Sequence, residues 1–470
     1  MKTTKYIIGS LLILLFTHCG EADIQGDIMI QNVHIVDVEQ SEIIPGQTIS
    51  IVDDEIVSIT PFSESQQTEG QIVINGRDKY VIPGLWDMHT HVFSTNSDST
   101  SHRMDLSNKL MIANGVTGFR EMGYATEEAA QLFREGLRKD DYLPQRFIYA
   151  NLVLDGDPPV YDQPQIVKAL KTGEQAEAAI DSILTYTKAD FIKIYSVLSP
   201  EVFHAIAAYC NKHQIDFAGH FPVHVPLSEI AESGIKSLEH GYELVPAFSD
   251  QADAALEDQR LSPPEYRQMF DDHDDATAEA FFNKLRENDV WITPTLTINK
   301  GLARFSASDS LVLSDERRKY VDWKSWEGPP PAAHPFYEER FTLIEERIQP
   351  AHQAGVGILA GTDAGFSNPL VYDGFSLHEE LQLLVEAGMP PFEVLKTATL
   401  NPAKYMNATD SLGTVEEGKK ADLVLLHQNP FEDIRNTQEI LGVISSGEYF
   451  DRTQLDELLN EVESYYSDEL

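Results

Sequence analysis

The sequence predicts an α/β fold, a (β/α)8 TIM barrel joined to a small β-sandwich domain that is built from both ends of the chain. Three observations support this prediction. Five short segments carry residues that can bind a divalent metal, stretches long enough to hold a helix separate them, and β-like runs flank the series at both ends. In a parallel barrel the carboxyl ends of the strands meet at one face, so ligands from distant segments converge there.

The barrel is expected to occupy residues 83–404 of the 470-residue chain. The five ligand-bearing segments are 86–91, 191–194, 217–220, 237–240 and 361–364. Further strands are expected at 118–121, 146–150, 290–296 and 356–360, with helices such as 200–213 and 375–387 between strands. Two connections, 243–284 and 298–340, exceed ordinary βα loops, and long loops on the active face usually shape the substrate site.

The β-sandwich is expected from residues 27–82 and 405–450, where apolar and polar residues alternate as they do in half-buried strands. Two distant sets of strands on either side of a barrel indicate one domain made from both chain ends. Residues 451–470 are expected to form an acidic helix, as a solvated surface element.

The candidate metal ligands are four histidines, one aspartate and one lysine. Imidazole and carboxylate suit zinc-like ions, and this set is too large for one tetrahedral site but about right for two ions that share a bridge. Taken singly, a His-x-His pair or a lone histidine more often belongs to an ordinary core, so the ordered set carries the prediction. The six residues are His89, His91, Lys193, His220, His240 and Asp363.

Lys193 is the least usual member of this set. Its neighbours Ile192 and Ile194 would point away from the barrel axis, which leaves the lysine pointing inward. A buried, unpaired ammonium group is costly, and conversion to a carbamate would remove the positive charge and supply a bidentate anion.

At these residues the sequence resembles the amidohydrolase superfamily, in the branch of imidazolonepropionase-like enzymes and metal-dependent prolidases. The resemblance covers roughly residues 27–435 and includes supporting segments at 81–85, 115–117 and 418–424. It implies that His89 and His91 are the strand-one pair and that Asp363 is the strand-eight ligand. It also implies two divalent ions, with zinc expected, and a Lys193 carboxylated by CO2 that bridges them.

The resemblance further implies hydroxide attack with Asp363 as the residue that takes the proton and passes it on. Tyr242 is a candidate donor to the oxyanion, against the alternative of a packing tyrosine. Arg120 and Tyr195 are candidates to bind a substrate carboxylate, although inward structural roles fit equally well. Two more histidines, His224 and His378, are candidate substrate contacts, and a loop position or helix-start packing would explain them as simply.

The leading expected function is hydrolysis of an amide C–N bond in a dipeptide, an N-acyl amino acid or a cyclic amide. The same hydroxide would also serve an esterase, lactonase or phosphotriesterase. A mononuclear deaminase gives Lys193 no reason to face the metals. A non-catalytic ligand-binding lipoprotein is the alternative from another class, and it would be signalled by a missing ligand.

The net charge of the chain restricts the classes of partner that it is expected to bind. With 76 acidic against 35 basic residues the net charge is −41, which repels nucleic acid and an anionic membrane surface. A small-molecule substrate is therefore expected, and a homo-oligomer stays open.

The first residues predict export. Residues 1–19 have a basic start and a short apolar run at 6–16, and residues 16–20 resemble a bacterial lipoprotein box with Cys19 as the lipidated residue. Phe16 and His18 depart from the usual box, which leaves simple periplasmic secretion open. Residues 20–26 would be a tether to the outer membrane. Cys210 is the only other cysteine, so acylation would leave no intrachain disulfide.

Overall fold

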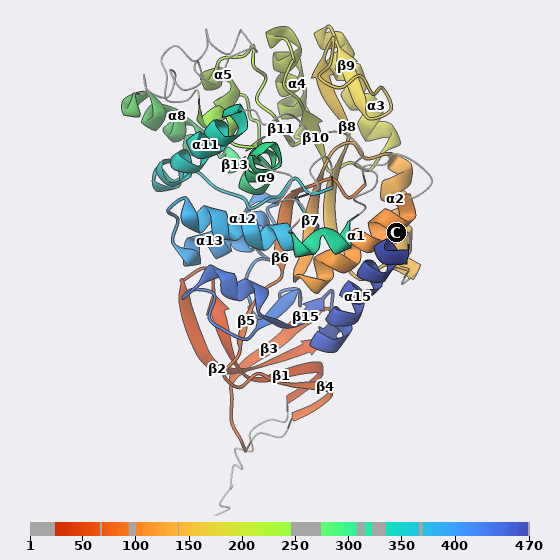
Figure 1. Cartoon of the computed structure of the whole chain (residues 1–470), viewed down its shortest axis with the longest axis vertical. Helices are drawn as coiled ribbons and strands as arrows, with labels where there is room; N and C mark the ends of the chain where they lie inside the picture. The colour runs from red at the N-terminus through yellow and green to blue at the C-terminus, as the bar shows by residue number, and fades with distance from the viewer. Residues whose placement is uncertain are drawn as a thin grey trace, which may run out of the picture.

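The computed structural model describes residues 24–65, 68–93, 100–139, 141–245, 274–307, 315–321, 335–365 and 370–468. A barrel surrounded by helices forms the larger part of the molecule, and a β-rich domain lies below it in the view of Figure 1. The predicted signal segment, with Cys19, and most of the two long connections fall outside the described residues. Within the described ranges, no helix is both long and apolar enough to cross a membrane.

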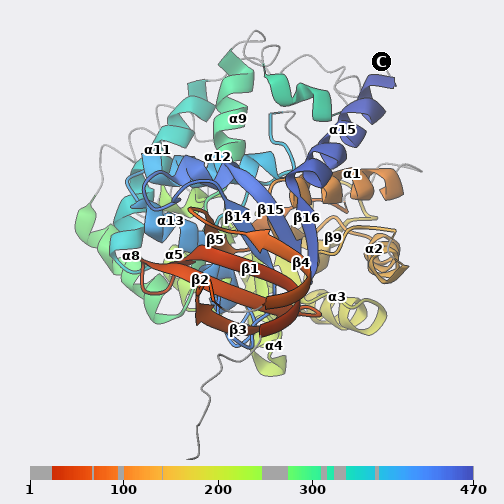
Figure 2. The same ribbon diagram turned by 90° about the horizontal axis from the view of Figure 1, so that it is seen from below.

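The small domain draws its strands from both ends of the chain, as predicted. They form one hydrogen-bonded sheet in the order β16-β15-β14-β5-β1-β2-β3, with β4 paired to β1. β5 joins the two halves, because it pairs in parallel with β1 and antiparallel with β14. Figure 2 shows the two sets of strands side by side. The bounds are β1 (Ile24–Asp37), β2 (Glu42–Val52), β3 (Glu55–Pro61), β4 (Thr68–Asn75), β5 (Tyr80–Pro83), β14 (Leu423–Leu426), β15 (Ile440–Ser445) and β16 (Glu448–Asp451).

The alternation of apolar and polar residues explains why these segments form a sheet with one buried face. On β1 and β2, isoleucines at alternate positions, such as Ile28, Ile30, Ile49 and Ile51, are buried in one apolar cluster. β1 already begins at Ile24, so the end of the predicted 20–26 tether is part of the sheet.

The barrel strands run in parallel in the order β6-β7-β8-β10-β11-β12-β13, and β9 pairs with β8. Their bounds are β6 (Leu85–Thr90), β7 (Val116–Met122), β8 (Arg146–Gly156), β9 (Val167–Leu170), β10 (Phe191–Ile194), β11 (Phe217–Gly219), β12 (Ser237–Glu239) and β13 (Trp291–Thr293). Strand seven is shorter than the predicted 290–296, because a helix starts at Leu296.

Helices follow the strands and cover the barrel (Figure 1). The predicted helix 200–213 is α4, which has Ser199 as its N-cap and Pro200 in its first turn. The bounds are α1 (Thr100–Ala113), α2 (Glu127–Lys139), α3 (Gly173–Tyr186), α4 (Pro200–His213), α5 (Leu227–Ala231), α8 (Asp275–Glu287), α9 (Leu296–Ala307), α11 (Pro335–Gln353), α12 (Phe375–Glu386), α13 (Pro391–Thr397), α14 (Leu400–Tyr405) and α15 (Arg452–Asp468). The described residues also include the 3-10 turns η1 (Tyr242–Leu244), η3 (Glu316–Tyr320) and η4 (Ile434–Gln438).

The eighth side of the barrel is an extended segment, residues 356–364, that bridges the first and seventh strands. Isolated parallel bridges join Ile358 to Ile292 on β13 and Ala364 to Thr90 on β6. The backbone N–H groups of Met88 and His91 donate to the carbonyl groups of Ala360 and Ala364. The predicted strand eight therefore closes the barrel with only sparse pairing.

The predicted acidic helix at the C-terminus is α15. Most of its described side chains are exposed or half-buried, whereas Leu455 and Val462 are fully buried. The helix packs against α1 and η3, and Glu461 and Glu463 form ion pairs with Lys109 and Lys319. One face of the acidic helix is therefore an apolar contact surface, which the charge of the segment concealed.

Candidate metal centre

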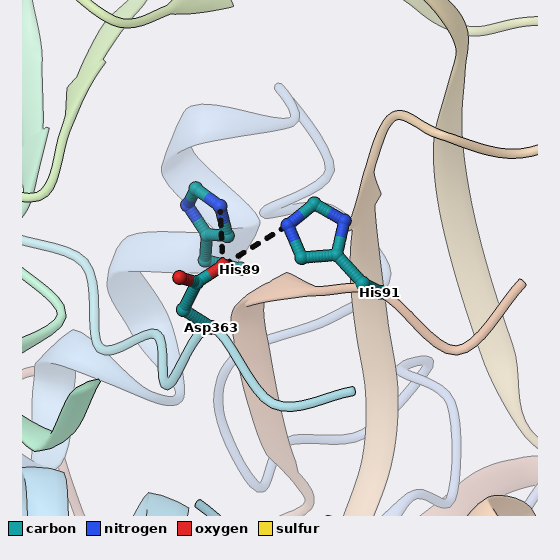
Figure 3. Close-up of side chains that lie close together, drawn as sticks. All are labelled: His89, His91 and Asp363. Carbon is teal, nitrogen blue, oxygen red and sulfur yellow. Dashed lines mark ion pairs between the residues drawn. The ribbon is translucent and has the colours of Figure 1, made fainter. Parts of the chain in front are cut away.

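β6 and the extended segment 356–364 meet where the barrel closes, and they supply the most compact group of possible metal ligands. His89 and His91 lie on β6 and just after it, and Asp363 lies on the extended segment opposite. Asp363 Oδ1 is 3.3 Å from His89 Nε2 and 3.0 Å from His91 Nε2 (Figure 3). One ligand atom from each of the three residues lies within 4.8 Å of the others. This geometry fits a shared divalent cation.

The two remaining histidines adjoin this group. The ring of His240 is 4.6 Å from the ring of His89 and 4.5 Å from the ring of His220, measured between centroids. His220 follows β11 and His240 follows β12, so the carboxyl ends of three strands contribute imidazoles.

Lys193 lies on β10 with only 1% of its surface exposed, and its Nζ has no hydrogen-bond partner among the described residues. Burial lowers the pKa of this amine to about 8. Its charge also acts on the pKa values of His91, His220 and His240. The structure thus brings all six predicted ligands to one end of the barrel, while their coordination of metal stays a prediction.

Two of these residues have unusual backbones. His240 has φ of 70° and Asp363 has φ of 61°, both in the left-handed region that side chains other than glycine seldom adopt. The turn at His240 interrupts the alternation of β12, so Glu239 and His240 both reach the barrel interior. Such backbone strain is often found where a protein fixes functional side chains.

Each histidine is held through its Nδ1 atom. His89 Nδ1 lies 2.8 Å from Glu239 Oε2, and His91 Nδ1 lies 3.2 Å from the carbonyl oxygen of Gly123. Because these oxygens accept, Nδ1 carries a hydrogen in both rings, and Nε2 is the nitrogen that faces Asp363. His220 and His240 are held in the same way by hydroxyl groups, Ser196 Oγ and Thr295 Oγ1, each at 2.9 Å. Support of this kind orients imidazole ligands in metal sites.

Glu239 is a functional residue that the sequence reasoning did not single out. It is fully buried and accepts from Arg120 Nη2 with both oxygens, at 3.0 and 2.9 Å. Burial alone would raise the pKa of Glu239, but the charge of Arg120 outweighs it and holds the carboxylate ionised. A glutamate in a buried strand beside a candidate ligand was the available signal, since such a charge requires a partner.

Arg120 is therefore placed differently from the predicted substrate contact. Its side chain is fully buried on β7, and its guanidinium also donates to Ser237, Thr293 and Tyr405 and to the carbonyl of Met88. These contacts cross the barrel interior from strand to strand. The structure corrects this prediction: Arg120 is a structural cation that supports Glu239.

His378 is also corrected. It is buried on α12, where Nδ1 lies 2.9 Å from Thr437 Oγ1 and Nε2 lies 3.0 Å from the carbonyl oxygen of Asn114. Asn114 follows α1 and precedes β7, at the opposite end of the barrel strands from the candidate ligands. Helix packing, the simpler of the two alternatives, describes His378.

The two tyrosines lie beside the candidate centre. The Tyr242 ring stacks on His240 at 5.2 Å with an interplanar angle of 27°, and the Arg340 guanidinium lies 4.5 Å from the same ring. The Tyr195 ring is 3.9 Å from the ring of His220. His224 lies in an exposed turn after β11, and its role as a substrate contact stays a prediction.

Burial sets the charge state of the group. It lowers the pKa values of His91, His220 and His240, which keeps these imidazoles neutral near pH 7. Burial would raise the pKa of Asp363, but its contacts with His89 and His91 hold it well below its usual range. Neutral imidazoles beside an ionised carboxylate are the donor set that a divalent ion requires.

Sequence comparison assigns the family. Residues 80–449 match the amidohydrolase family. The chain belongs to this family. Ochratoxinase of Aspergillus niger is 40% identical over 93 residues, and this match spans only 18% of that enzyme. The 5-methylthioadenosine/S-adenosylhomocysteine deaminase of Caldanaerobacter subterraneus is 20% identical over 86% of this chain and 85% of that protein.

Solved structures share the fold of this amidohydrolase. A Xaa-Pro dipeptidase with bound methionine has a TM-score of 0.68 at 20% identity, with 90% of this chain and 99% of that chain covered. Bottromycin amidohydrolase has a TM-score of 0.69 at 23% identity, with 93% and 90% covered. The barrel with a small added domain is therefore confirmed as the fold class.

Proposed function

We propose that this amidohydrolase is a metal-dependent hydrolase that cleaves an amide C–N bond, in a dipeptide, an N-acyl amino acid or a cyclic amide. One observation carries the proposal. Imidazoles held through Nδ1, the Asp363 carboxylate and the buried Lys193, whose Nζ has no hydrogen-bond partner among the described residues, converge at the carboxyl ends of the barrel strands.

The residues fit two divalent ions, with zinc expected. His89, His91 and Asp363 would hold one ion, His220 and His240 a second, and a carboxylated Lys193 would bridge them. The orphaned Nζ of Lys193 supports the carbamate, since addition of CO2 would replace an unpaired buried cation by an anion with two oxygen donors. When bound, such ions lower the pKa of water and polarise a carbonyl group.

The protein groups around the ions would carry the proton and orient the substrate. Asp363 contacts both β6 histidines through Oδ1, and 13% of its side chain is exposed, so it can receive a proton and pass it to the leaving nitrogen. Tyr242 is stacked on His240 and partly buried, which suits a hydroxyl donor to the oxyanion.

The test is hydrolysis of a library of dipeptides, N-acyl amino acids and cyclic amides by the metal-loaded protein, with metal content measured in the same preparation. Release of a free amine with about two ions per chain is the expected result. Release of ammonia with one ion per chain would instead identify a deaminase, the activity named for the relative from Caldanaerobacter. Hydrolysis of esters, lactones or phosphotriesters without amide cleavage would also contradict the proposal.

We also propose that the protein is exported and anchored by a lipid at Cys19. The basic start and short apolar run of residues 1–19 support this location. Fatty-acid labelling in a bacterial host is expected for the full chain and not for Cys19→Ala, with Cys210→Ala as the control. Label that persists in Cys19→Ala would contradict the anchor.

A further inference from the structure

Three tyrosines from three different barrel loops meet beside the candidate metal ligands. Tyr124 follows β7, Tyr161 lies between β8 and β9, and Tyr195 follows β10. The Tyr161 ring is 6.3 Å from the ring of Tyr124 and 5.9 Å from the ring of Tyr195. These centroid distances are typical of aromatic pairs in contact.

This tyrosine cluster, Tyr124, Tyr161 and Tyr195, extends from the ligands to the surface. The Tyr124 ring lies 5.2 Å from the ring of His91, and the Tyr195 ring lies 3.9 Å from the ring of His220. Tyr124 is only 3% exposed, whereas Tyr161 is 36% exposed. A molecule whose amide lies at the ligands would therefore have aromatic surface beside it that continues outward.

A buried carboxylate holds two of the three loops together. Asp155 Oδ2 accepts from the backbone N–H of Val160 at 2.8 Å, and Asp155 Oδ1 accepts from that of Val197 at 2.9 Å. Both partners lie within two residues of a cluster tyrosine. At Gly156 a Cβ would overlap the carbonyl oxygen of Val197, so only glycine permits this close approach. Asp155 and Gly156 thus fix the positions of the loops that carry Tyr161 and Tyr195.

The cluster packs on apolar side chains. Tyr124 packs with Val153, Ile166 and Val167, and Tyr195 packs against the same group. Burial raises the pKa values of Tyr124 and Tyr195, so both hydroxyl groups are neutral at any physiological pH.

We propose that the tyrosine cluster is a specificity subsite that binds an uncharged ring of the substrate, such as an aromatic side chain, next to the scissile amide. This inference rests on the proposed amide hydrolysis and deepens it, because it names the side chain that the enzyme selects. Stacking and edge-to-face contacts with tyrosine rings would favour the ring over a small aliphatic group.

The test compares Tyr161→Ala with the wild type, because Tyr161 is exposed enough to be replaced without loss of the fold. Tyr161→Phe is the conservative variant, and Tyr186→Ala on α3, where the tyrosine is 78% exposed, is the control for removal of a surface tyrosine. Substrates are matched dipeptides, glycyl-phenylalanine against glycyl-alanine and phenylalanyl-glycine against alanyl-glycine. The pair that responds shows which side of the amide faces the cluster.

We expect kcat/KM for the phenylalanine dipeptide to fall about tenfold in Tyr161→Ala, and for the alanine dipeptide to stay within about twofold. Tyr161→Phe should restore the preference, and Tyr186→Ala should leave it unchanged. Equal losses on both dipeptides, or no loss on either, would overturn the subsite. A preference for lysyl or arginyl dipeptides that Tyr161→Ala abolishes would show a cation site instead.

A binding measurement separates this inference from the proposed function. Reduced dipeptides, in which CH2–NH replaces the scissile amide, resist hydrolysis and can be titrated into the same variants by calorimetry. If no amide is cleaved but the phenylalanine analogue binds about tenfold more weakly to Tyr161→Ala, the amide function fails and the subsite stands. If amides are cleaved but neither rate nor binding responds to Tyr161→Ala, only the subsite fails.

Discussion

His89 and His378 are both buried histidines with both ring nitrogens in contact with protein, yet their positions differ in kind. His89 is held through Nδ1 by Glu239, so its Nε2 faces Asp363. His378 places Nε2 against the carbonyl of Asn114, which only accepts, so that nitrogen carries the hydrogen. The first ring turns Nε2 toward the candidate metal centre, and the second ring joins α12 to η4 and to the end of α1.

The comparison teaches that the surroundings of Nε2, rather than burial, distinguish a candidate ligand histidine. His91, His220 and His240 have Nδ1 tied to the protein as His89 does, but His378 shares that support. Burial lowers the pKa of His378 to about 4, and it also lowers the pKa values of His220 and His240. The pKa shift therefore has the same direction in both groups and does not separate them.

The largest expected effect belongs to Asp363, which the β6 histidines face. Asp363→Asn removes a charged ligand and the proton acceptor while keeping the side-chain shape, so kcat on an amide substrate should fall by about a thousandfold. The melting temperature of the metal-free protein should change little. His378→Gln is the matched control and should keep near-normal kcat. Turnover of Asp363→Asn within a few-fold of wild type would show that another group moves the proton.

Lys193→Ala extends the comparison to the sixth predicted ligand. Loss of the bridge should lower bound metal from about two ions per chain and reduce turnover by about a hundredfold or more. Propionate or acetate at high concentration should restore part of both, since it supplies the carboxylate oxygens without the tether. Metal analysis and rates with and without propionate provide the measurement. Two bound ions with normal turnover in the variant would exclude the bridge.

Glu239→Gln tests whether support of His89 matters as much as the ligand itself. The amide keeps one oxygen acceptor but loses the charge that fixes the Nδ1 hydrogen, so metal affinity should fall about 10- to 100-fold. The buried Arg120 would also lose its counter-ion, and the free energy of unfolding should fall by about 3 kcal/mol. Competition with a chelator and thermal unfolding measure the two effects. Unchanged metal affinity would limit Glu239 to pairing with Arg120.

The smallest effect concerns His378 and appears in pH dependence. Its pKa is about 4 in the fold against 6.5 as the ordinary value, so below pH 6.5 the unfolded chain takes up a proton that the folded chain refuses. Stability is thus lost as pH falls, by about 2 kcal/mol between pH 7.5 and 5. His378→Gln should remove this share of the acid sensitivity without a change in metal content. An identical loss of melting temperature in both proteins would contradict the assignment.

The convergence of the candidate ligands could be predicted because each of them lies in a segment with a local strand pattern. Each ligand ends or follows a short apolar strand, and parallel topology then brings the strand ends together. The roles of Arg120 and His378 could not be predicted, because they depend on partners 119 and 264 residues away in sequence. Arg120 lies near a strand end, as a substrate contact would, and only the position of Glu239 shows that it is committed to the core.

Other contacts between distant segments could not be predicted for the same reason. α15 has an acidic sequence, and the apolar contacts of Leu455 and Val462 become visible only once α1 lies beside them. The tyrosine cluster likewise joins three loops that no spacing relates. These features depend on packing between distant segments. The strands of the small domain, in contrast, follow from the alternation of apolar and polar residues within each segment.

The sparse pairing of residues 356–364 has a consequence for local opening of the barrel. β6 and residues 356–364 meet through a few backbone hydrogen bonds, and the Asp363 carboxylate faces both β6 histidines across that seam. A cation bound by His89, His91 and Asp363 would hold β6 and residues 356–364 together. Chelation should therefore raise amide hydrogen exchange first at Met88, His91 and Asp363, while β8 and β10 on the far side of the ring stay protected.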